Sequence, residues 1–290
     1  MAAVCFSLWL LATAQLGRVW APAPALPACG PIDCADLACW GVDQKMPVAY
    51  VFSPVPLQVM CDFRTAGGGW TVIQNRRDPD VDFYRTWAEY KKGFGRGATF
   101  WMGLDHIHRL TKDREMILRI EVGYENRSLY REKHIEYDEF SISGESSRYR
   151  LHIGNVRPGN TLPDSLIEHA EGRFCTKDSP DCKMARDYFE TGWWYRGNEP
   201  TYGVDLNAKM VSRIVHLRIA WKDVDAYFMM TMMKIRPQSF KAKGRLTCDR
   251  TCPNGGTCRR MPDHSFECEC AAGFSGPQCR ITKAAHQRSG

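Results

Sequence analysis

Residues 60–74 read MCDFRTAGGGWTVIQ, and they carry the strongest local signal for the fold. Its three consecutive glycines, Gly67 to Gly69, allow backbone angles with positive φ, because a glycine carries no Cβ. The run that begins at Trp70 predicts a strand with a buried tryptophan. We therefore expect a tight turn that leads directly into a strand of the core.

On both sides of this stretch, short apolar runs alternate with Gly-rich turns. A period of two over 118–122 and 149–153 predicts half-buried strands, whereas 87–90 and 165–169 predict short helices. The expected fold class is α+β: a globular domain with an antiparallel sheet and long loops, followed by a small disulfide-rich module.

Composition limits the classes of function. Hydrophobic residues make up 44% of the 290 residues and nine are tryptophan, which is enough for a core and argues against wholesale disorder. The formal net charge of +6 is spread along the sequence. Because no dense basic stripe with interleaved aromatic residues occurs, we expect no nucleic-acid partner.

The N-terminus carries a short apolar run from Val4 to Ala14 that ends in Ala-Thr-Ala. This run is too short to span a bilayer and predicts a secretory signal peptide over 1–14. A Pro/Ala-rich leader is expected over 15–28. No later segment approaches the roughly 20 apolar residues of a membrane helix, so we expect no membrane insertion.

Cysteine usage indicates an oxidising compartment. One of the thirteen cysteines, Cys5, lies in the predicted signal, and its removal leaves an even number. The sequon that begins at Asn126 predicts a glycosylation site. The protein is therefore predicted to be secreted and extracellular.

Six of the cysteines lie within about thirty residues near the C-terminus. So short a segment holds too little apolar surface for a core and needs disulfides, each of which contributes roughly 2–4 kcal/mol. Spacing alone leaves 15 pairings open. The module is predicted over 247–280, after a polar linker at 240–246 and before a polar tail at 281–290.

The CEC triplet at 268–270, GFSG at 273–276 and PNGGTC at 253–258 resemble an EGF-like domain. The resemblance implies that Cys248 pairs with Cys258, Cys252 with Cys268, and Cys270 with Cys279. The family's calcium-binding version has acidic residues just before its first cysteine, where this sequence reads GRLT. We therefore expect a spacer or protein-contact module without calcium.

The segment 29–239 resembles the fibrinogen C-terminal domain family of ficolins, tenascin tails and angiopoietins. The resemblance rests on 60–74 and on motifs that follow in family order: VDFYR at 81–85, GFG at 93–95, GLDHIHRLT at 103–111, DSL at 164–166, GWWY at 192–195 and MKIRP at 233–237. It implies a disulfide between Cys34 and Cys61. Cys29 and Cys39 remain, and they either pair with each other or bridge two chains into a disulfide-linked homodimer.

The sequence departs from the family at the calcium loop and at the second disulfide. Asp178 matches the first calcium ligand of the family, but Pro180 replaces the second, and Asp181 offers an oxygen only from a shifted position. We therefore expect no metal at this remnant loop and no cofactor elsewhere. Asn198 stands where the second family disulfide ends, which predicts that Cys182 pairs instead with Cys175.

That missing disulfide forms a wall of the acetyl-group pocket in ficolin-like proteins. The loop from Asp178 to Asn207 is still predicted to be the recognition face, because loops on a scaffold carry specificity. Its residues of contact type are Tyr195, Arg196, Asn198, Glu199, Tyr202 and Asn207. The leading hypothesis is binding of a glycan or glycoprotein in innate immunity, and the alternative is a matrix or receptor-ligand protein that contacts a cell-surface receptor.

An enzymatic function is not expected. The sequence has no HExxH and no GxSxG motif. Ser165 and His169 suggest a hydrolase fragment, but the serine lacks a backbone oxyanion context, and the family resemblance explains both residues as scaffold. The resemblance likewise assigns His106 and His108 to the scaffold and not to a metal pair.

Overall fold

The computed structural model describes residues 31–39, 48–52, 56–126, 129–197, 203–211, 217–224, 226–240, 252–260, 266–275, 279 and 281–282. The predicted signal peptide, the leader, Cys29 and Cys248 lie outside these residues, as do two residues of the Asn126 sequon. The side chains of Cys39 and Cys258 are likewise not described. The predicted pairs Cys29–Cys39 and Cys248–Cys258 therefore stay predictions.

The large domain contains three α-helices among its described residues: α1 (Cys34–Cys39), α2 (Trp87–Lys92) and α3 (Leu104–Thr111). Its short 3-10 helices are η1 (Thr65–Gly67), η2 (Glu145–Ser147) and η3 (Leu166–His169), and η4 (Met184–Tyr188) is a π-helix. Its strands are β1 (Val48–Phe52), β2 (Pro56–Asp62), β3 (Trp70–Arg76), β4 (Phe94–Arg96), β5 (Thr99–Trp101), β6 (Met116–Asn126), β7 (Leu129–Tyr137), β8 (Phe140–Ile142), β9 (Leu151–Ile153), β10 (Arg173–Cys175), β11 (Trp193–Tyr195), β12 (Val204–Asp205), β13 (Ala220–Trp221) and β14 (Tyr227–Pro237).

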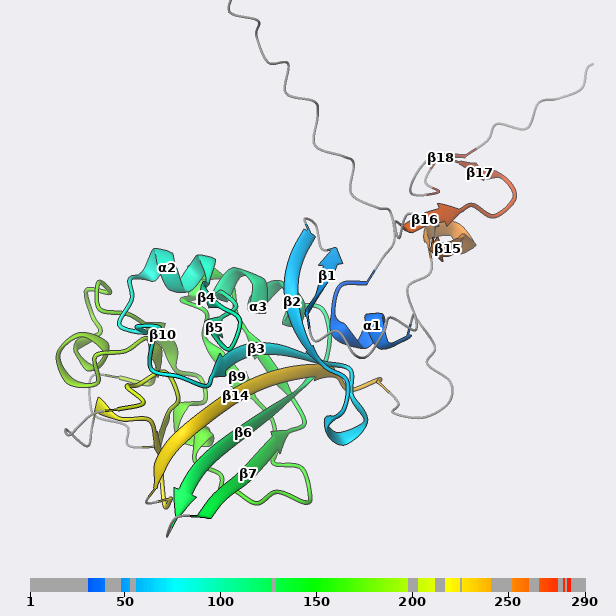
Figure 1. Ribbon diagram of the computed structural model, residues 1–290. Coiled ribbons are helices and arrows are strands. Elements are labelled where there is room, and N and C mark those ends of the chain that lie inside the picture. The colour runs from blue at the N-terminus through cyan, green and yellow to red at the C-terminus, as the bar shows by residue number, and fades with distance from the viewer. Residues whose placement is uncertain are drawn as a thin grey trace, which may run out of the picture.

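Eight of these strands form one antiparallel sheet with the order β1-β2-β3-β14-β6-β7. The short strand β5 pairs with the second half of β3, and β4 pairs with β5. The long strand β14 runs between β3 and β6, although it comes last in the domain (Figure 1). The predicted α+β class with an antiparallel sheet and long loops is confirmed.

The glycine turn enters the sheet as expected. Gly67, Gly68 and Gly69 all have positive φ, between 74° and 90°. A Cβ on Gly68 would lie 2.4 Å from the carbonyl oxygen of Phe63, so a larger residue would clash with the backbone. Trp70 follows with no exposed surface. The local signal thus fixes where β3 begins, and β3 then pairs with β14 in the sheet.

The other predicted elements appear with shifted bounds. The helix predicted at 87–90 is α2, which starts with a capping box between Thr86 and Glu89. The helix predicted at 165–169 is the 3-10 turn η3, and the strand predicted at 149–153 is β9, which begins at Leu151. The core packs large buried rings around Trp101, Phe174 and Trp194.

The C-terminal module contains η6 (Pro253–Gly255), β15 (Thr257–Arg260), β16 (Phe266–Glu269), β17 (Phe274–Ser275) and β18 (Ile281–Thr282). The strands form two antiparallel pairs, β15 with β16 and β17 with β18. Four disulfides join described cysteines of the protein, and all four were expected: Cys34–Cys61, Cys175–Cys182, Cys252–Cys268 and Cys270–Cys279. Among the described helices, none is long and apolar enough to cross a membrane.

Candidate functional site

A disulfide closes the loop that connects β10 to β11. The bond joins Cys175 to Cys182, seven positions apart, and both cysteines are buried. Inside this loop the Thr176 and Ser179 hydroxyl oxygens lie 3.0 Å apart, and the Ser179 hydroxyl accepts a hydrogen bond of 3.1 Å from the Thr176 N–H. The loop is therefore held by one covalent bond and a small internal network.

Asp178 fastens one side of this loop to helix α2. Its Oδ1 accepts hydrogen bonds from the Thr176 hydroxyl at 2.7 Å and from the backbone N–H of Trp87 at 2.8 Å. Trp87 is the first residue of α2, and the first N–H groups of a helix have no partner within the helix. A carboxylate at this end also complements the helix dipole.

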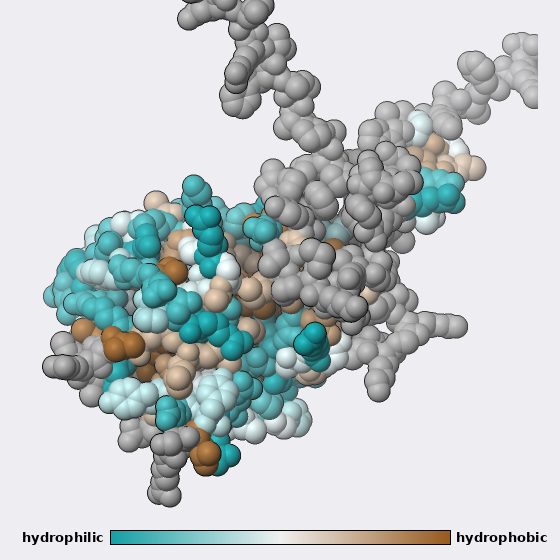
Figure 2. Space-filling model, viewed as in Figure 1, coloured by the Kyte–Doolittle hydropathy of each residue, from teal (hydrophilic) through white to brown (hydrophobic). Residues whose placement is uncertain are grey.

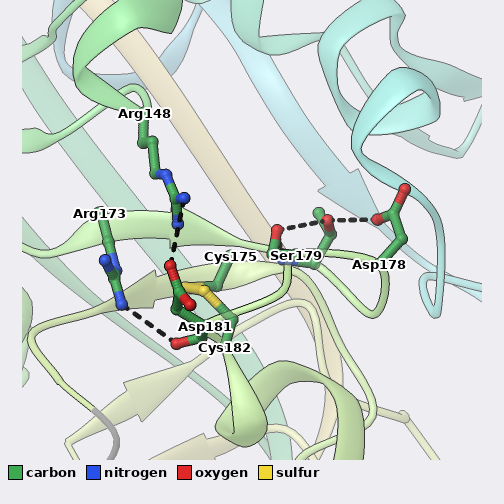
Figure 3. The surroundings of a disulfide bond; sticks show 8 residues. Arg148, Arg173, Cys175, Asp178, Ser179, Asp181 and Cys182 are labelled. Carbon is green, nitrogen blue, oxygen red and sulfur yellow. Dashed lines mark hydrogen bonds and ion pairs between the residues drawn. A yellow bond between two sulfur atoms is a disulfide. The ribbon is translucent and has the colours of Figure 1, made fainter.

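Asp181 lies on the other side of the loop. Its carboxylate is 3.4 Å from the Arg148 guanidinium, and its backbone carbonyl accepts a hydrogen bond of 3.1 Å from Arg173. Figure 3 shows the carboxylates of Asp178 and Asp181 on different sides of the loop with different partners, and the disulfide beside Asp181. Each acidic group thus has a protein partner of its own.

This arrangement does not fit a calcium ion, which takes 6–8 oxygen ligands around one point. The two carboxylates of the remnant loop do not converge, and arginine side chains lie beside Asp181. No group of three or more His, Cys, Asp or Glu side chains able to hold a metal occurs in the part of the protein that the structure describes.

A second contact ties the loop to the segment before α2. The Lys177 ammonium donates to the Tyr84 carbonyl at 2.9 Å and lies 4.9 Å from the centre of the Tyr84 ring. The Tyr84 hydroxyl donates to the carbonyl of Arg186 at 3.0 Å. Tyr84 is therefore held between the disulfide-closed loop and η4, which follows that loop in the sequence.

Next to Tyr84 lies a cleft of about 240 Å³. One wall is formed by Pro79 and 81–84 and the other by 207–211, and Glu190 lies at the rim. Lys209 forms an ion pair with Glu190, and Val211 is 77% exposed. We call the disulfide-closed loop, this cleft and its two walls the recognition face.

The floor of the cleft is a buried polar network. The Arg76 guanidinium stacks 4.1 Å from the centre of the Phe83 ring and donates to the carbonyls of Leu206 and Ala208. Asp205 accepts hydrogen bonds from the Tyr195 hydroxyl and from two backbone N–H groups. Burial raises the pKa of Asp205 to about 7. These contacts preorganise the floor, while Asp82 and Val211 of the walls remain exposed.

Two of the predicted contact residues are wrong as surface contacts. Tyr195 is 1% exposed, because the pairing of β10 with β11 turns its ring inward against Phe189. Asn207 is also 1% exposed, and its amide nitrogen donates to the Gly192 carbonyl while its oxygen accepts from Gln74. Tyr195 supports the cleft from below, whereas Asn207 is buried but also lines it.

Of the remaining predicted contacts, Arg196 is exposed directly after β11. Asn198, Glu199 and Tyr202 lie outside the described residues. The sequence analysis missed Tyr84, Lys177 and Lys209 as parts of the face, and it placed Glu190 within the predicted loop but not among the contact residues. Tyr84 belongs to a motif that indicated only scaffold, and the others stand in no motif, so no local signal pointed to them.

His169 is a structural residue of the same region. It has no exposed surface; its Nδ1 lies 2.7 Å from the Trp194 carbonyl, and its Nε2 accepts a hydrogen bond from the N–H of Val204. Burial lowers its pKa to about 4, so the ring is neutral at neutral pH. With both nitrogens bound to backbone, the ring joins η3 to β11 and β12 and cannot serve Ser165 as a base.

Comparisons with known proteins agree with this fold. The family model of the C-terminal globular domain of fibrinogen beta and gamma chains matches residues 31–238, and the EGF-like domain model matches 248–278. Angiopoietin-related protein 7 of Mus musculus is 36% identical over 216 residues, which are 69% of this chain and 60% of that protein. Fibroleukin of Homo sapiens is 34% identical, over 72% of this chain and 52% of that protein.

A third relative, ryncolin-4 of Cerberus rynchops, is 36% identical over 65% of this chain and 56% of its own length. The chain thus spans between half and three fifths of these relatives. The fibrinogen-like globe domain of human ANGPTL6 superposes with a TM-score of 0.62 at 30% identity, over 74% of this chain and 99% of that one. The lamprey fibrin D-dimer, complexed with the peptide Gly-His-Arg-Pro-amide, shares the fold with a TM-score of 0.60 at 23% identity, over 76% of this chain and 79% of that one.

Proposed function

The protein belongs to the family defined by the C-terminal globular domain of fibrinogen beta and gamma chains and carries an EGF-like domain after it, and from this premise we propose that it is a secreted, extracellular recognition protein. In this proposal the fibrinogen-like domain binds a glycan or a glycoprotein in innate immunity. The site is the recognition face, and the protein works by binding and not by catalysis.

The observation that carries the proposal is the cleft of about 240 Å³ beside the disulfide-closed loop. Ligand pockets for drug-sized molecules usually measure about 300–1,000 Å³. A cleft below that range suits a single sugar residue or one side chain, with the surrounding face in contact with the rest of the ligand. Loops on a rigid scaffold are where binding specificity is placed.

The walls of the cleft offer groups of two kinds. Asp82, Glu190 and Lys209 supply charged hydrogen-bonding groups at the rim, which suit the hydroxyl groups of a sugar. Val81 and Met210 supply apolar surface beside them. A hydroxyl-rich ligand with one apolar face meets both kinds of group in the same cleft.

A second candidate is a receptor-ligand or matrix function through protein–protein contacts. Val211, at the edge of the cleft, is 77% exposed and apolar, which suits a protein partner better than a sugar. The EGF-like domain would add a second contact. The sequence contains no Arg-Gly-Asp, so a receptor would be bound by the face and not through that motif.

A glycan array probed with the purified full-length protein, with and without calcium, tests the first candidate. Asp82→Asn should weaken binding about tenfold or more, because it removes the charge of a rim carboxylate. The matched control is Asp80→Asn, since Asp80 is also exposed but does not line the cleft. If the wild-type protein binds no glycan on the array, acetylated glycans included, the proposal of a glycan ligand is rejected.

Proximity labelling on cells tests the second candidate. A protein ligand is supported if Val211→Glu abolishes the labelling of a receptor and Asp80→Asn preserves it. If neither Asp82→Asn nor Val211→Glu changes any binding, the recognition face is wrongly placed. Electrophoresis with and without reductant would show a disulfide-linked homodimer, which supplies the multivalency that a weak sugar site needs.

A further inference from the structure

A second pocket lies where the main sheet divides. Strand β3 pairs with β2 through Val72, Thr71 and Trp70, and from Gln74 onward it pairs with β5 instead. Between these two neighbours of β3 the structure has a pocket of about 450 Å³. It is lined by parts of β2, β4 and β5 and by His106 of α3, none of which belongs to the recognition face.

The walls of this pocket are apolar and adaptable. Met60, Phe94, Phe100 and Met102 line it, and methionine side chains adjust to irregular partners. Met60 and Phe100 also pack on a separate apolar cluster on β3 and β14. Figure 2 shows hydrophobic residues that reach the surface between hydrophilic ones over the region of β3 to β5. The pocket volume lies within the range of ordinary ligand sites.

The rim of the pocket is basic. Lys92, Arg96 and His106 line it, and no acidic side chain does. Lys92 and Arg96 are exposed and form no ion pair with any residue that the structure describes. The Arg109 guanidinium contacts the His106 ring and adds positive charge beside it. A ligand with carboxylates around an apolar centre therefore meets complementary charge here.

At the pocket, strand edges left unpaired among the described residues favour an extended peptide over a simple amphipathic molecule as the ligand. Residues 57–59 of β2 pair with β1 on one side, and their pairing with β3 starts only at Met60. Strand β4 pairs only with β5 among the described strands. Both strands line the pocket, so backbone groups of a bound extended segment have strand edges to pair with.

We propose that this pocket at the sheet fork docks an extended segment of a partner protein in which acidic side chains flank a large apolar one. Apolar side chains of the segment fill the space between Met60 and Phe100, and its carboxylates lie against Lys92 and Arg96. The site is separate from the recognition face and gives the domain a second binding surface.

The test uses the full-length protein with ¹³C-methyl-labelled methionine and the probe peptide acetyl-Glu-Leu-Glu-Phe-Glu-amide. Saturable shifts of the Met60 and Met102 methyl signals are expected below about 1 mM, while Met184 stays unchanged. Arg96→Glu, at an exposed position, should weaken binding about fivefold or more, because it replaces an attraction at the rim by a repulsion. The matched control Lys112→Glu, on an exposed lysine outside the pocket, should leave the affinity unchanged.

Several results would overturn the proposal. These are absence of saturable shifts up to about 1 mM, equal binding of a peptide with Lys in place of Glu, or unchanged affinity in Arg96→Glu. Binding of laurate without binding of the peptide would show a site for amphipathic acids instead. Shifts of Met60 that depend on protein concentration alone would show that a second copy of the protein occupies the pocket. Because none of these measurements involves the cleft, failure here leaves the proposed function untouched.

Discussion

Removal of the Cys175–Cys182 bond is the sharpest test of how the recognition face is built. The closed loop has eight residues, since the cysteines are seven positions apart. The chain-entropy relation gives about 2.5 kcal/mol of stabilisation for a loop of that length at 25 °C. The double variant Cys175→Ala/Cys182→Ala should therefore lower the free energy of unfolding by about 2.5 kcal/mol.

Urea titration followed by tryptophan fluorescence measures this change in the large domain alone, because no tryptophan lies beyond Trp221. The matched comparison is Cys34→Ala/Cys61→Ala, whose cysteines are 27 positions apart. The same relation gives about 3.6 kcal/mol for that loop, so the second variant should be the less stable of the two by about 1 kcal/mol. A loss near zero in the first variant, or the reverse order, would refute the reasoning that chain entropy holds the loop in place.

The effect on the face itself is local. In the first variant, amide hydrogen exchange should rise at 177–181, while exchange in β3 and β14 should stay slow. If exchange at 177–181 stays as slow as in the wild type, the contacts of Asp178 and Asp181 hold the loop without the covalent bond. The disulfide would then be unnecessary for the shape of the face.

Three further outcomes follow from buried groups and from the remnant loop. The pKa of His169 falls from 6.5 to about 4 on folding, so its neutral ring stabilises the fold fully above about pH 6.5, and this stability is lost as the pH falls towards 4. Urea titrations should show that the wild type loses about 3 kcal/mol between pH 7 and pH 4 relative to His169→Asn. A difference between the two proteins that does not depend on pH would contradict this. Calcium added to chelator-treated protein should leave Tm unchanged, because the remnant loop gathers no ligand set, whereas a clear upward shift would show a site. Lys234, with no exposed surface, contacts Asp62 at 2.6 Å and Glu121 at 2.8 Å. Lys234→Met should cost about 3–5 kcal/mol, because Asp62 loses its ion-pair partner, whereas Glu121 keeps Arg119 at 2.6 Å; a smaller loss would mean that water reaches Asp62.

The sequence predicts the fold where the signal is local. The glycines before Trp70 and the capping box at Thr86 each act within a few residues, and both elements form where they are expected. Whether a strand residue faces in or out depends on a partner far away in the sequence. Tyr195 has the composition of a contact residue, but its pairing opposite Arg173 and its bond to Asp205 place it in the core. No local pattern carries that information.

The cleft is even harder to predict from the sequence than the burial of Tyr195. Tyr84, Glu190 and Lys209 meet although more than a hundred positions separate the first from the other two, so only the assembled fold reveals the site. The sequence does identify the departure from the family at Cys175, because a new cysteine leaves a visible change in the spacing of cysteines. The sequence does not show which groups the altered loop contacts.

The loop contacts hold the recognition face in shape through groups of the protein itself. A cation would hold two carboxylates together from within, whereas here Asp178 is bound outward to helix α2 and Asp181 outward to Arg148. The disulfide beside Asp181 closes the loop that these two contacts hold from different sides. Since Lys177 also holds Tyr84 at the wall of the cleft, the same loop positions part of the proposed binding surface. Binding at this face should then respond to reductant, which breaks the bond, and not to chelator, and the opposite pattern would contradict a preformed face.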